Sequence, residues 1–247
     1  MPTVPKWLGN VMENVFSGSF TDVTVTATEY LTDTLKLVSF SSPDIITNTK
    51  MIFTPGQKIE FRVSDTDYRH YTPATFNKTK GSLDVLFYLH DKGPGSQWAS
   101  QLTIGMQLKM IGPGGKMQYR PSADIHIVFG DETSLGIFKS IRDHAVAAQQ
   151  QCYCFAELLP AHTHWPDLIQ LSDLSASTLE PASRAQHAIQ QFTALASGLP
   201  YRPDQYAFYL TGNARSIQSF RNGLLPMGFK RSQVQTDPYW TEGKRGL

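Results

Sequence analysis

The sequence predicts two domains in succession: an antiparallel six-stranded β-barrel over residues 1–120 and a doubly wound parallel α/β domain over residues 121–247. A chain of 247 residues is long enough for two domains that each bury a core. Its first half consists of short alternating segments between turn residues, whereas its second half alternates apolar runs with helical periodicity. The change follows Gly112-Pro113-Gly114-Gly115, and we place the boundary near Arg120-Pro121-Ser122.

The barrel prediction rests on short segments of strand character. Alternating apolar residues, valines and threonines are typical of half-buried strands. They occur at 22–30, 34–40, 58–63, around Arg69, at 82–90 and at 106–111. In this half, only 96–102 and a short amphipathic lead-in at 7–20 have helical character. Closely spaced short strands favour a small closed antiparallel barrel.

The α/β prediction rests on apolar runs that alternate with helical patterns. The apolar runs lie at 124–129, 151–158, 167–171, 205–210 and 232–236, and the helical patterns at 133–149, 185–195 and 214–225. This alternation implies a parallel sheet with helices on both faces.

Composition excludes several classes of protein. With 22 Lys and Arg against 21 Asp and Glu, the net charge of +1 gives no electrostatic case for binding nucleic acid or anionic membranes. No apolar run reaches the roughly 18 residues of a membrane span, and the polar start does not resemble a signal peptide. We therefore expect a cytoplasmic protein without membrane insertion.

No metal site is expected. Cys152 and Cys154 lie in an apolar run without a further cysteine nearby, so we interpret them as reduced core thiols. His162 and His164 lack a neighbouring acidic or sulfur ligand, which is more typical of a surface loop than of a metal site.

Two segments of the first half suit a nucleotide. In Arg69-His70-Tyr71-Thr72, arginine offers a fork of donors for phosphate, and tyrosine and threonine offer a flat face and hydroxyls. In the segment from His90 to Ala99, a glycine-rich turn precedes a short helix, whose first amides bind phosphate. Each segment alone is also compatible with an ordinary edge strand or loop. Together they favour a flavin dinucleotide.

The ordered motifs resemble those of the siderophore-interacting flavoproteins of the ferredoxin-reductase superfamily. In the first half they are Arg69-His70-Tyr71-Thr72, Leu83-Asp84-Val85 running to His90, Gly93-Pro94-Gly95-Ser96 with Trp98-Ala99, and Gly112-Pro113-Gly114-Gly115. In the second half they are Gly130-Asp131-Glu132-Thr133-Ser134-Leu135 and Tyr239-Trp240-Thr241-Glu242-Gly243-Lys244. The resemblance covers nearly the whole chain. It implies FAD in the barrel, reduction of ferric siderophores, and a chain whose chemistry is carried by the flavin rather than by a catalytic side chain.

The resemblance also implies site residues. For FAD these are Arg69, His70, Tyr71, Thr72, Asp84, Leu86, His90, Gly93, Pro94, Gly95, Ser96 and Trp98, with Asp131, Thr133, Ser134, Tyr239 and Trp240 in the second domain. Asp131 and Thr133 also suit ordinary helix capping, and the two tail aromatics either pack on the core or cover the flavin. A bulky anionic siderophore needs a basic floor, for which we select Lys50, Lys244 and Arg245 over Arg62, Lys230 and Arg231.

Departures from the family pattern leave the electron donor open. Thr211-Gly212-Asn213-Ala214 replaces the usual alanine-glycine-glutamate-alanine, and 164–174 lacks the family's tryptophan-rich strand that ends in arginine. No glycine triplet follows Phe129. NADPH, NADH and reduced ferredoxin all remain candidates. We expect a monomer, and keep two alternative functions: a flavin reductase or diaphorase, and a binding module without cofactor.

Overall fold

The computed structural model describes residues 20–199 and 202–243. Lys244, Arg245 and nearly all of the predicted lead-in at 7–20 therefore lie outside the described residues. Internal contacts divide the chain into two compact units, Met1–Lys116 and Met117–Leu247, with the division slightly before the predicted boundary. None of the described helices combines the length and the hydropathy that a membrane span requires.

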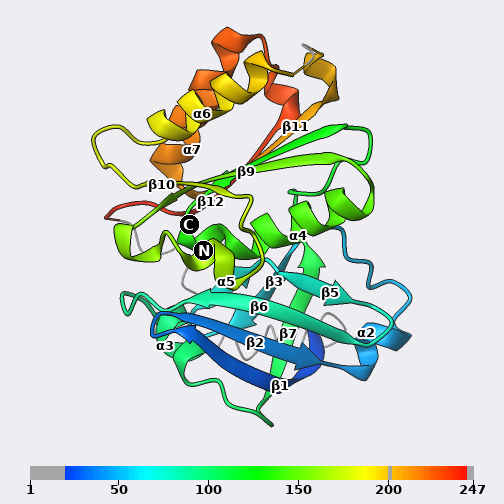
Figure 1. Cartoon of the computed structure of the whole chain (residues 1–247). Helices are drawn as coiled ribbons and strands as arrows, with labels where there is room; N and C mark the ends of the chain where they lie inside the picture. Colours follow the sequence, from blue (N-terminus) through cyan, green and yellow to red (C-terminus); the bar gives the residue numbers. More distant parts are fainter. Residues whose placement is uncertain (1–19, 200–201, 244–247) are drawn as a thin grey trace. The chain divides into compact units, whose positions relative to one another are not determined.

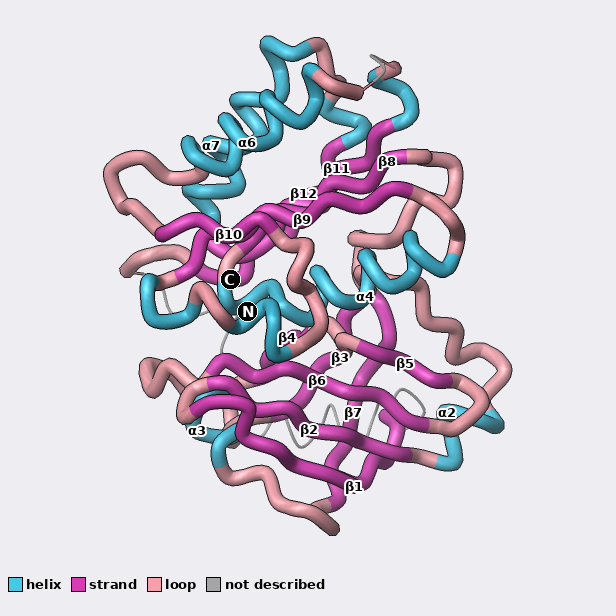
Figure 2. The backbone as a smooth tube through the Cα atoms, viewed as in Figure 1, coloured by secondary structure: helices cyan, strands magenta, loops and turns pink. Residues whose placement is uncertain are grey.

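The first unit is built on one antiparallel sheet of seven strands in the order β4-β3-β7-β1-β2-β6-β5, shown in magenta in Figure 2. Two short helices, α2 (Pro43–Thr47) and α3 (Pro94–Ser100), accompany it. The strands are β1 (Phe20–Thr32), β2 (Leu35–Ser41), β3 (Lys58–Arg62), β4 (Tyr68–Tyr71), β5 (Thr75–Asn77), β6 (Ser82–Tyr88) and β7 (Gln107–Gly114). Among the described strands no pairing joins β4 to β5, so the hydrogen-bonded order has two ends.

The sequence predicted six strands where the sheet has seven. The additional strand is β5, which pairs with β6 and has only three residues. Such a short edge strand cannot show the alternation that identifies longer strands. Elsewhere the alternation is clear: Leu83, Val85 and Phe87 of β6 are buried in the core, whereas the residues between them are half-buried.

The second unit is a doubly wound α/β domain, as predicted. Its sheet has five parallel strands in the order β10-β9-β8-β11-β12. In Figure 1, α6 and α7 cover one face of this sheet and α4 covers the other. The strands are β8 (Ile125–Gly130), β9 (Gln151–Leu158), β10 (Ser175–Thr178), β11 (Tyr206–Asn213) and β12 (Val234–Trp240). The α-helices are α4 (Leu135–Ala147), α5 (Trp165–Leu168), α6 (Gln186–Ser197) and α7 (Ala214–Leu224).

Single-turn 3-10 helices complete the second unit: η2 (Glu132–Ser134), η3 (Pro160–His162), η4 (Pro203–Gln205), η5 (Leu225–Met227) and η6 (Arg231–Gln233). Its core is rich in phenylalanine: the rings of Phe129 and Phe220 stack at 4.6 Å, and Phe192 meets Phe208 edge-on at 5.6 Å. Every residue of β8 is buried, as expected for a central strand of a covered parallel sheet.

The apolar run at 167–171 does not form the strand that it predicted. It belongs to α5 and the turn that follows, where Ile169 and Leu171 are buried. The third parallel strand is instead β10, a polar edge strand of sequence SAST that pairs only with β9 among the described strands. Ile169 and Leu171 thus bury the loop after α5 in the core. Strand β10 is held in the sheet by its backbone pairing with β9.

Candidate functional site

In the first unit, strand alternation sorts the predicted residues of β4 onto two faces. Arg69 and Tyr71 share one face, and His70 lies on the other. There the Nε2 atom of His70 lies 3.3 Å from Oε2 of Glu60, its cross-strand neighbour on β3. The structure thus brings Arg69 and Tyr71 together and directs His70 away from them.

The start of α3 lies directly against this Arg69 and Tyr71 face. A Cβ atom added at Gly95 would lie 2.7 Å from the Tyr71 hydroxyl and 3.2 Å from Cγ of Arg69. Only glycine leaves room for such an approach. Gly93 occupies the N-cap position without a side-chain cap, and Pro94 follows it at the first turn. The first amides of α3 thus have no capping side chain among the described residues.

The turn that precedes α3 is organised by its own side chains. The buried Ser96 hydroxyl accepts a hydrogen bond of 3.0 Å from the amide of Asp91, whose φ is 58°. Nδ1 of His90 accepts from the amide of Lys92 at 3.2 Å, and the ring stands edge-on to Tyr88. His90 and Ser96 therefore shape the loop that carries Gly93 and Gly95.

Aromatic contacts hold Tyr71 in place. Its ring meets Phe87 edge-on at 4.7 Å and lies nearly parallel to Trp98 of α3 at 6.2 Å. Burial raises the pKa of the Tyr71 hydroxyl well above its ordinary value, with the Arg69 charge opposing the shift. The hydroxyl therefore stays protonated at neutral pH and is able to donate a hydrogen bond.

Arg69 is held beside Tyr71 with donors left for a ligand. Its guanidinium donates to the carbonyl oxygen of Tyr68 at 2.7 Å and to Oδ1 of Asp67 at 3.4 Å. A guanidinium has five N–H donors in a planar fork that matches phosphate. An arginine, a fixed aromatic ring and helix amides that meet at one glycine fit the phosphates and the ring of a flavin nucleotide.

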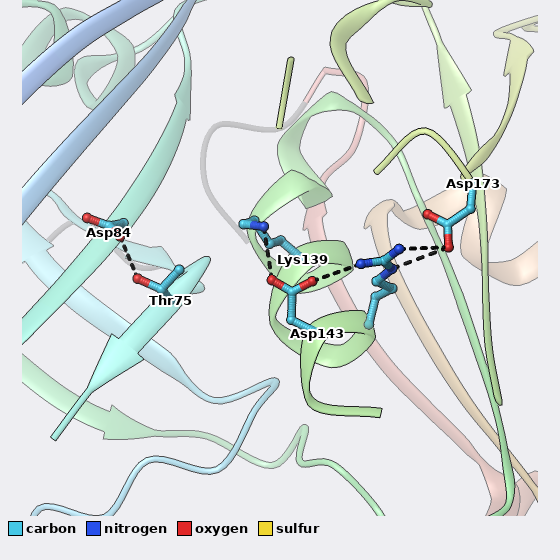
Figure 3. Close-up of polar contacts among 6 residues, drawn as sticks. Thr75, Asp84, Lys139, Asp143 and Asp173 are labelled. Atoms are coloured by element: carbon cyan, nitrogen blue, oxygen red, sulfur yellow. Dashed lines mark hydrogen bonds and ion pairs between the residues drawn. The ribbon is translucent and has the colours of Figure 1, made fainter. Parts of the chain in front are cut away.

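Asp84 has a structural role in the sheet. Its carboxylate oxygens accept hydrogen bonds of 2.6 Å from the hydroxyls of Ser39 and Thr75, which ties β2 and β5 to β6; Figure 3 shows the bond to Thr75. Leu86 shares this half-buried side of β6, and Thr72 is buried just after β4. Asp84 and Leu86 thus lie on the side of β6 opposite Phe87, the residue that contacts Tyr71.

The described cations that were considered for substrate binding are exposed or bonded to their own turn. Lys50 is exposed in the loop after α2, and Lys230 and Arg231 are exposed in the second unit. Arg62 donates to the backbone carbonyls of Ser64 and Asp65, at 3.2 and 2.8 Å, and so supports its own turn.

In the second unit, the Asp131 carboxylate joins the ends of three strands. Asp131 follows β8 directly and is buried. Its Oδ1 accepts from the amide of Thr133 at 2.9 Å and also from the Thr133 hydroxyl. Its Oδ2 accepts from the amide of Asn213 at 2.8 Å and from Nε1 of Trp240 at 2.7 Å. Asp131 is thus both the N-cap of η2 and the partner of the terminal residues of β11 and β12.

Gly212 allows the Asp131 contact to form. Its φ is +88°, and a Cβ atom there would lie 2.4 Å from Oδ2 of Asp131. The next residue, Asn213, caps α7: its Oδ1 accepts from the amides of Arg215 and Ser216 at 2.9 and 3.2 Å. Sequence reasoning read Asn213 only as a lost carboxylate and missed this role, although an asparagine before a helical pattern is a capping signal.

These residues surround the topological switch point of the sheet. From the central strand β8 the chain continues to β9 on one side, while β11 lies on the other side. In open α/β sheets, ligands bind in the crevice outside the carboxyl ends of the strands at such a point. Ser134, also predicted, is buried here and accepts from the Thr211 hydroxyl at 2.8 Å. Tyr239 is half-buried on β12.

His162 is not the surface residue that the sequence suggested. Its Nδ1 lies 2.9 Å from Oε1 of Glu132, a buried carboxylate that also accepts from the amide of Leu159 at 2.6 Å. The ring stacks on Trp165 at 3.9 Å. His164 is exposed. The described residues contain no group of His, Cys, Asp or Glu able to hold a metal ion, and Cys152 and Cys154 are free thiols.

An ion-pair network links the last turns of α4 to the loop before β10. Lys139 and Asp143 pair at 2.9 Å, and Arg142 bridges Asp143 and Asp173 at 3.3 and 3.2 Å; Figure 3 shows these carboxylates. The network ties the loop before β10 to α4. Its members satisfy one another, which is typical of a solvated structural surface.

Two family models match this chain, one in each of its two units. Residues 49–117 match the model of the siderophore-interacting FAD-binding domain, and residues 123–243 match the model of the siderophore-interacting protein. The ferric vibriobactin reductase ViuB of Vibrio cholerae is 26% identical over 181 residues, which are 71% of this chain and 65% of that protein. This alignment thus spans slightly less than two thirds of the relative.

Two further comparisons concern a partial relative and a solved structure. NADH-cytochrome b5 reductase 1 of Cryptococcus neoformans is 42% identical over 60 residues, which are 24% of this chain and 20% of that protein. The siderophore-interacting protein SipS from Aeromonas hydrophila superposes with a TM-score of 0.72 at 22% identity, over 92% of this chain and 93% of that one, and shows the same fold. With both family models matched in order along its two units, the chain belongs to the siderophore-interacting protein family.

Proposed function

We propose that the protein uses FAD to reduce ferric siderophores and so releases their iron as ferrous ion. The observation that carries this proposal is the close approach of Arg69 and Tyr71 to Gly95 at the start of α3, within the segment that matches the FAD-binding domain model. The match to a protein named as a ferric vibriobactin reductase supports the choice of substrate class.

The chemistry needs a carrier between the electron donor and a one-electron acceptor, ferric iron. When bound, FAD would supply a redox group that can pass electrons singly to ferric iron. One NADH or NADPH would then serve two ferric ions, whereas one reduced ferredoxin would serve one. Hard oxygen ligands hold ferrous iron far less tightly than ferric iron, so reduction releases the metal from the chelator. The protein itself need not coordinate iron.

In this proposal the chain binds and orients the cofactor. Arg69 donates to a phosphate, the amides at the start of α3 approach it past Gly95, and Tyr71 offers a flat face that Phe87 and Trp98 hold. His90, Gly93, Pro94 and Ser96 support this turn through the contacts described above.

In the second unit, Asp131 holds Trp240 at the carboxyl edge of the sheet. Asp131, Thr133, Ser134, Tyr239 and Trp240 remain proposed contacts to FAD. Lys50, Lys244 and Arg245 remain the proposed contacts to an anionic siderophore. NADH, NADPH or reduced ferredoxin supplies the electrons, and such donors suggest a cytoplasmic protein. We keep the expectation of a monomer.

The direct test is flavin retention. Loss of a charge-assisted phosphate contact costs about 1.5 to 3 kcal/mol, so Arg69→Ala should lower FAD affinity at least about tenfold. Tyr71→Ala should lower it through the loss of a stacking face. Lys109→Ala, which removes an exposed cation from β7 of the same unit, is the matched control and should retain full flavin. Full occupancy in both site variants contradicts the site.

The test of the substrate uses photochemically reduced protein, so that it does not depend on the donor. Mixed anaerobically with ferric hydroxamate or catecholate siderophores, the protein should reoxidise as ferrous iron is trapped. A second candidate is a diaphorase that passes electrons to a protein or quinone, favoured by the stretch shared with an NADH-cytochrome b5 reductase. Faster reoxidation by free flavin, quinone or cytochrome than by ferric siderophores would support that alternative. A colourless protein that binds no FAD would indicate a binding module.

A further inference from the structure

A polar network at the amino-terminal edge of the parallel sheet holds the segment that leads from β7 to β8. This segment, residues 115–124, forms neither helix nor strand. It is nevertheless fixed, because the amide of Arg120 donates to the Tyr209 hydroxyl of β11 at 2.9 Å. In addition, the Pro121 carbonyl accepts from Nε2 of Gln150 at 2.9 Å. Side chains of the second unit thus replace the strand pairing that the segment lacks.

His126 of β8 lies at the centre of this network and is fully buried. Its Nδ1 lies 3.1 Å from the Tyr209 hydroxyl, and its Nε2 lies 3.2 Å from Oε1 of Gln150. The Tyr119 hydroxyl also donates to this Oε1, and the Tyr119 ring stacks on the imidazole at 4.3 Å. The imidazole therefore contacts three side chains that fix residues 119–121.

The hydrogen bonds of its neighbours define the tautomer of His126. Nε2 of Gln150 donates to the Pro121 carbonyl, so Oε1 of Gln150 is an acceptor and Nε2 of His126 carries a proton. The Tyr209 hydroxyl accepts from the Arg120 amide, which leaves its hydrogen for Nδ1 of His126. Donors and acceptors therefore match when the imidazole is neutral and its proton is on Nε2.

A second proton on His126 disrupts this match. It places an N–H group on Nδ1, where the Tyr209 hydroxyl donates, so that buried hydroxyl loses its acceptor. It also places a charge on a side chain that is 0% exposed. Protonation of the imidazole therefore favours a state in which the network is open.

Titratable and charged groups face His126 from each neighbouring element. They are Tyr119, Arg120 and Asp124 of the segment, His144 of α4, Cys152 of β9 and Tyr209 of β11. Burial raises the pKa of Tyr119 to about 12 and that of Tyr209 above its ordinary value, so both hydroxyls keep their protons. Histidine changes its charge between pH 5 and 8, so His126 and the exposed His144 are the two candidates for acid sensitivity.

The surroundings of His126 favour its neutral form. Burial is the main cause that lowers its pKa, and His144 acts in the same direction. Gln150, the Ala123 carbonyl and the exposed Asp124 oppose the shift. Because the pKa is lower in the closed network than its ordinary value of 6.5, the stabilisation is present above pH 6.5 and is lost as the pH falls.

We propose that His126 is an acid-sensitive clamp on the segment between the two units. Neutral His126 holds residues 119–121 on the second unit, and its protonation opens the network and releases them. The exposed hydrogen bonds between Gln118 and Gln235, at 2.9 and 2.8 Å, remain, and they contribute little because water competes for them. The clamp does not depend on the proposed function.

Hydrogen exchange at the Arg120 amide tests the clamp locally, because this amide donates to Tyr209. Overall stability is a poor measure, since Asp131 titrates in the same range with the opposite sign. The flavin-loaded full-length protein is compared between pH 7.5 and 5, and exchange is expressed as a protection factor, which removes the intrinsic dependence of exchange on pH.

The protection factor of the Arg120 amide should fall below pH 6.5, by at most about tenfold per pH unit, because one proton is taken up on opening. The amide of Val25, which donates to the Met106 carbonyl in the first unit, is the reference and should keep its protection. Constant protection of Arg120 across this range, or an equal loss at Val25, overturns the proposal.

Variants separate His126 from its titratable neighbour. His126→Phe keeps a planar ring beside Tyr119 but removes the titrating group, so protection of the Arg120 amide should no longer depend on pH. His144→Gln removes the other candidate and should leave the dependence unchanged, as should His164→Gln at an exposed histidine. A dependence that persists in His126→Phe, or that disappears in His144→Gln, overturns the role of His126.

The unaltered protein provides a second measurement if His126→Phe does not fold. NMR of the 15N-labelled imidazole rings should show His126 neutral at pH 7.5 with its proton on Nε2, and its titration should lie below 6.5. A proton on Nδ1 at pH 7.5, or a titration at or above 6.5, overturns the proposal.

Discussion

Replacement of Gly212 by alanine should destabilise the second unit through its contact with Asp131. The new Cβ atom would lie 2.4, 2.6 and 2.8 Å from Oδ2, Cγ and Oδ1 of that carboxylate. These atoms cannot simply swing away, because Thr133, Asn213 and Trp240 all donate to them. In addition, the backbone at Gly212 has a φ of +88°, which side chains other than glycine rarely adopt.

The expected loss has two parts. A left-handed conformation costs an alanine about 1 to 2 kcal/mol. Displacement of the carboxylate breaks at least one hydrogen bond to a charged group, worth about 1.5 to 3 kcal/mol. We therefore expect the free energy of unfolding to fall by about 2.5 to 5 kcal/mol. Gly105→Ala isolates the first part, because Gly105 has a φ of +90° and a Cβ atom added there would meet no other atom within 4 Å.

Urea unfolding followed by circular dichroism measures both variants. A double-mutant cycle with Asp131→Ala tests the cause: without the carboxylate, Gly212→Ala should cost only the backbone part, which leaves a coupling energy of about 2 kcal/mol. Protection of the Asn213 amide against hydrogen exchange should fall in either single variant. A cost for Gly212→Ala no larger than for Gly105→Ala, or equal in both backgrounds, would refute the reasoning.

Three further predictions concern the two sites. Gly95→Ala should lower FAD affinity at least about tenfold, measured by flavin fluorescence, because its Cβ atom meets the Tyr71 hydroxyl at 2.7 Å; an unchanged affinity would contradict the approach of α3 to β4. Burial raises the pKa of Asp131 from 3.8 to about 6, so folding favours the protonated carboxyl. Protonation of Asp131 therefore contributes about 3 kcal/mol to the free energy of unfolding. This contribution is complete below pH 3.8 and is lost as the pH rises through 6. In parallel urea titrations, the free energy of unfolding of Asp131→Asn should therefore not show this decline between pH 4 and 7. The same dependence on pH in the variant and in the unaltered protein would count against the pKa shift. Neutralisation of Lys244 and Arg245 should raise the Michaelis constant for an anionic ferric siderophore at low salt and leave reduction of the flavin unchanged; equal constants at low salt would place the substrate elsewhere.

The candidate FAD site of the first unit could be predicted from the sequence because its signals are local. Arg69 and Tyr71 are two residues apart on one strand, and Gly95 stands in a glycine-proline turn before a helix, so spacing alone suggested both halves. What spacing did not show is which side chains stay on the ligand side. Pairing with β3 turns His70 toward Glu60. The Asp84 carboxylate already accepts hydrogen bonds from hydroxyls of β2 and β5.

The second site depended on contacts between distant segments. Asp131 meets Asn213 and Trp240 across separations of 82 and 109 residues, and no local pattern encodes either contact. Strand β10 was missed because an edge strand of serine, alanine and threonine has no apolar alternation.

Lys36 connects the fold of the first unit to the proposed flavin site. This lysine, on the inward side of β2, is only 1% exposed, and burial lowers its pKa. Its Nζ donates to the carbonyl oxygens of Ala99, Ser100 and Leu102 at 3.1, 3.1 and 2.8 Å, where α3 ends. A cation at this position satisfies carbonyls that a helix end leaves unpaired.

Helix α3 is thus fixed at both ends by different means. Lys36 holds its last carbonyls, while the hydroxyl of Ser96, in its first turn, holds the amide of Asp91 in the preceding turn. Its middle is held by Trp98, whose ring packs on Phe61 at 5.2 Å. A ligand phosphate that meets the start of this helix need not order it first, so little of the binding free energy is lost to ordering. This preorganisation gives a physical reason for a buried lysine 63 residues away from the nearest of its helix partners.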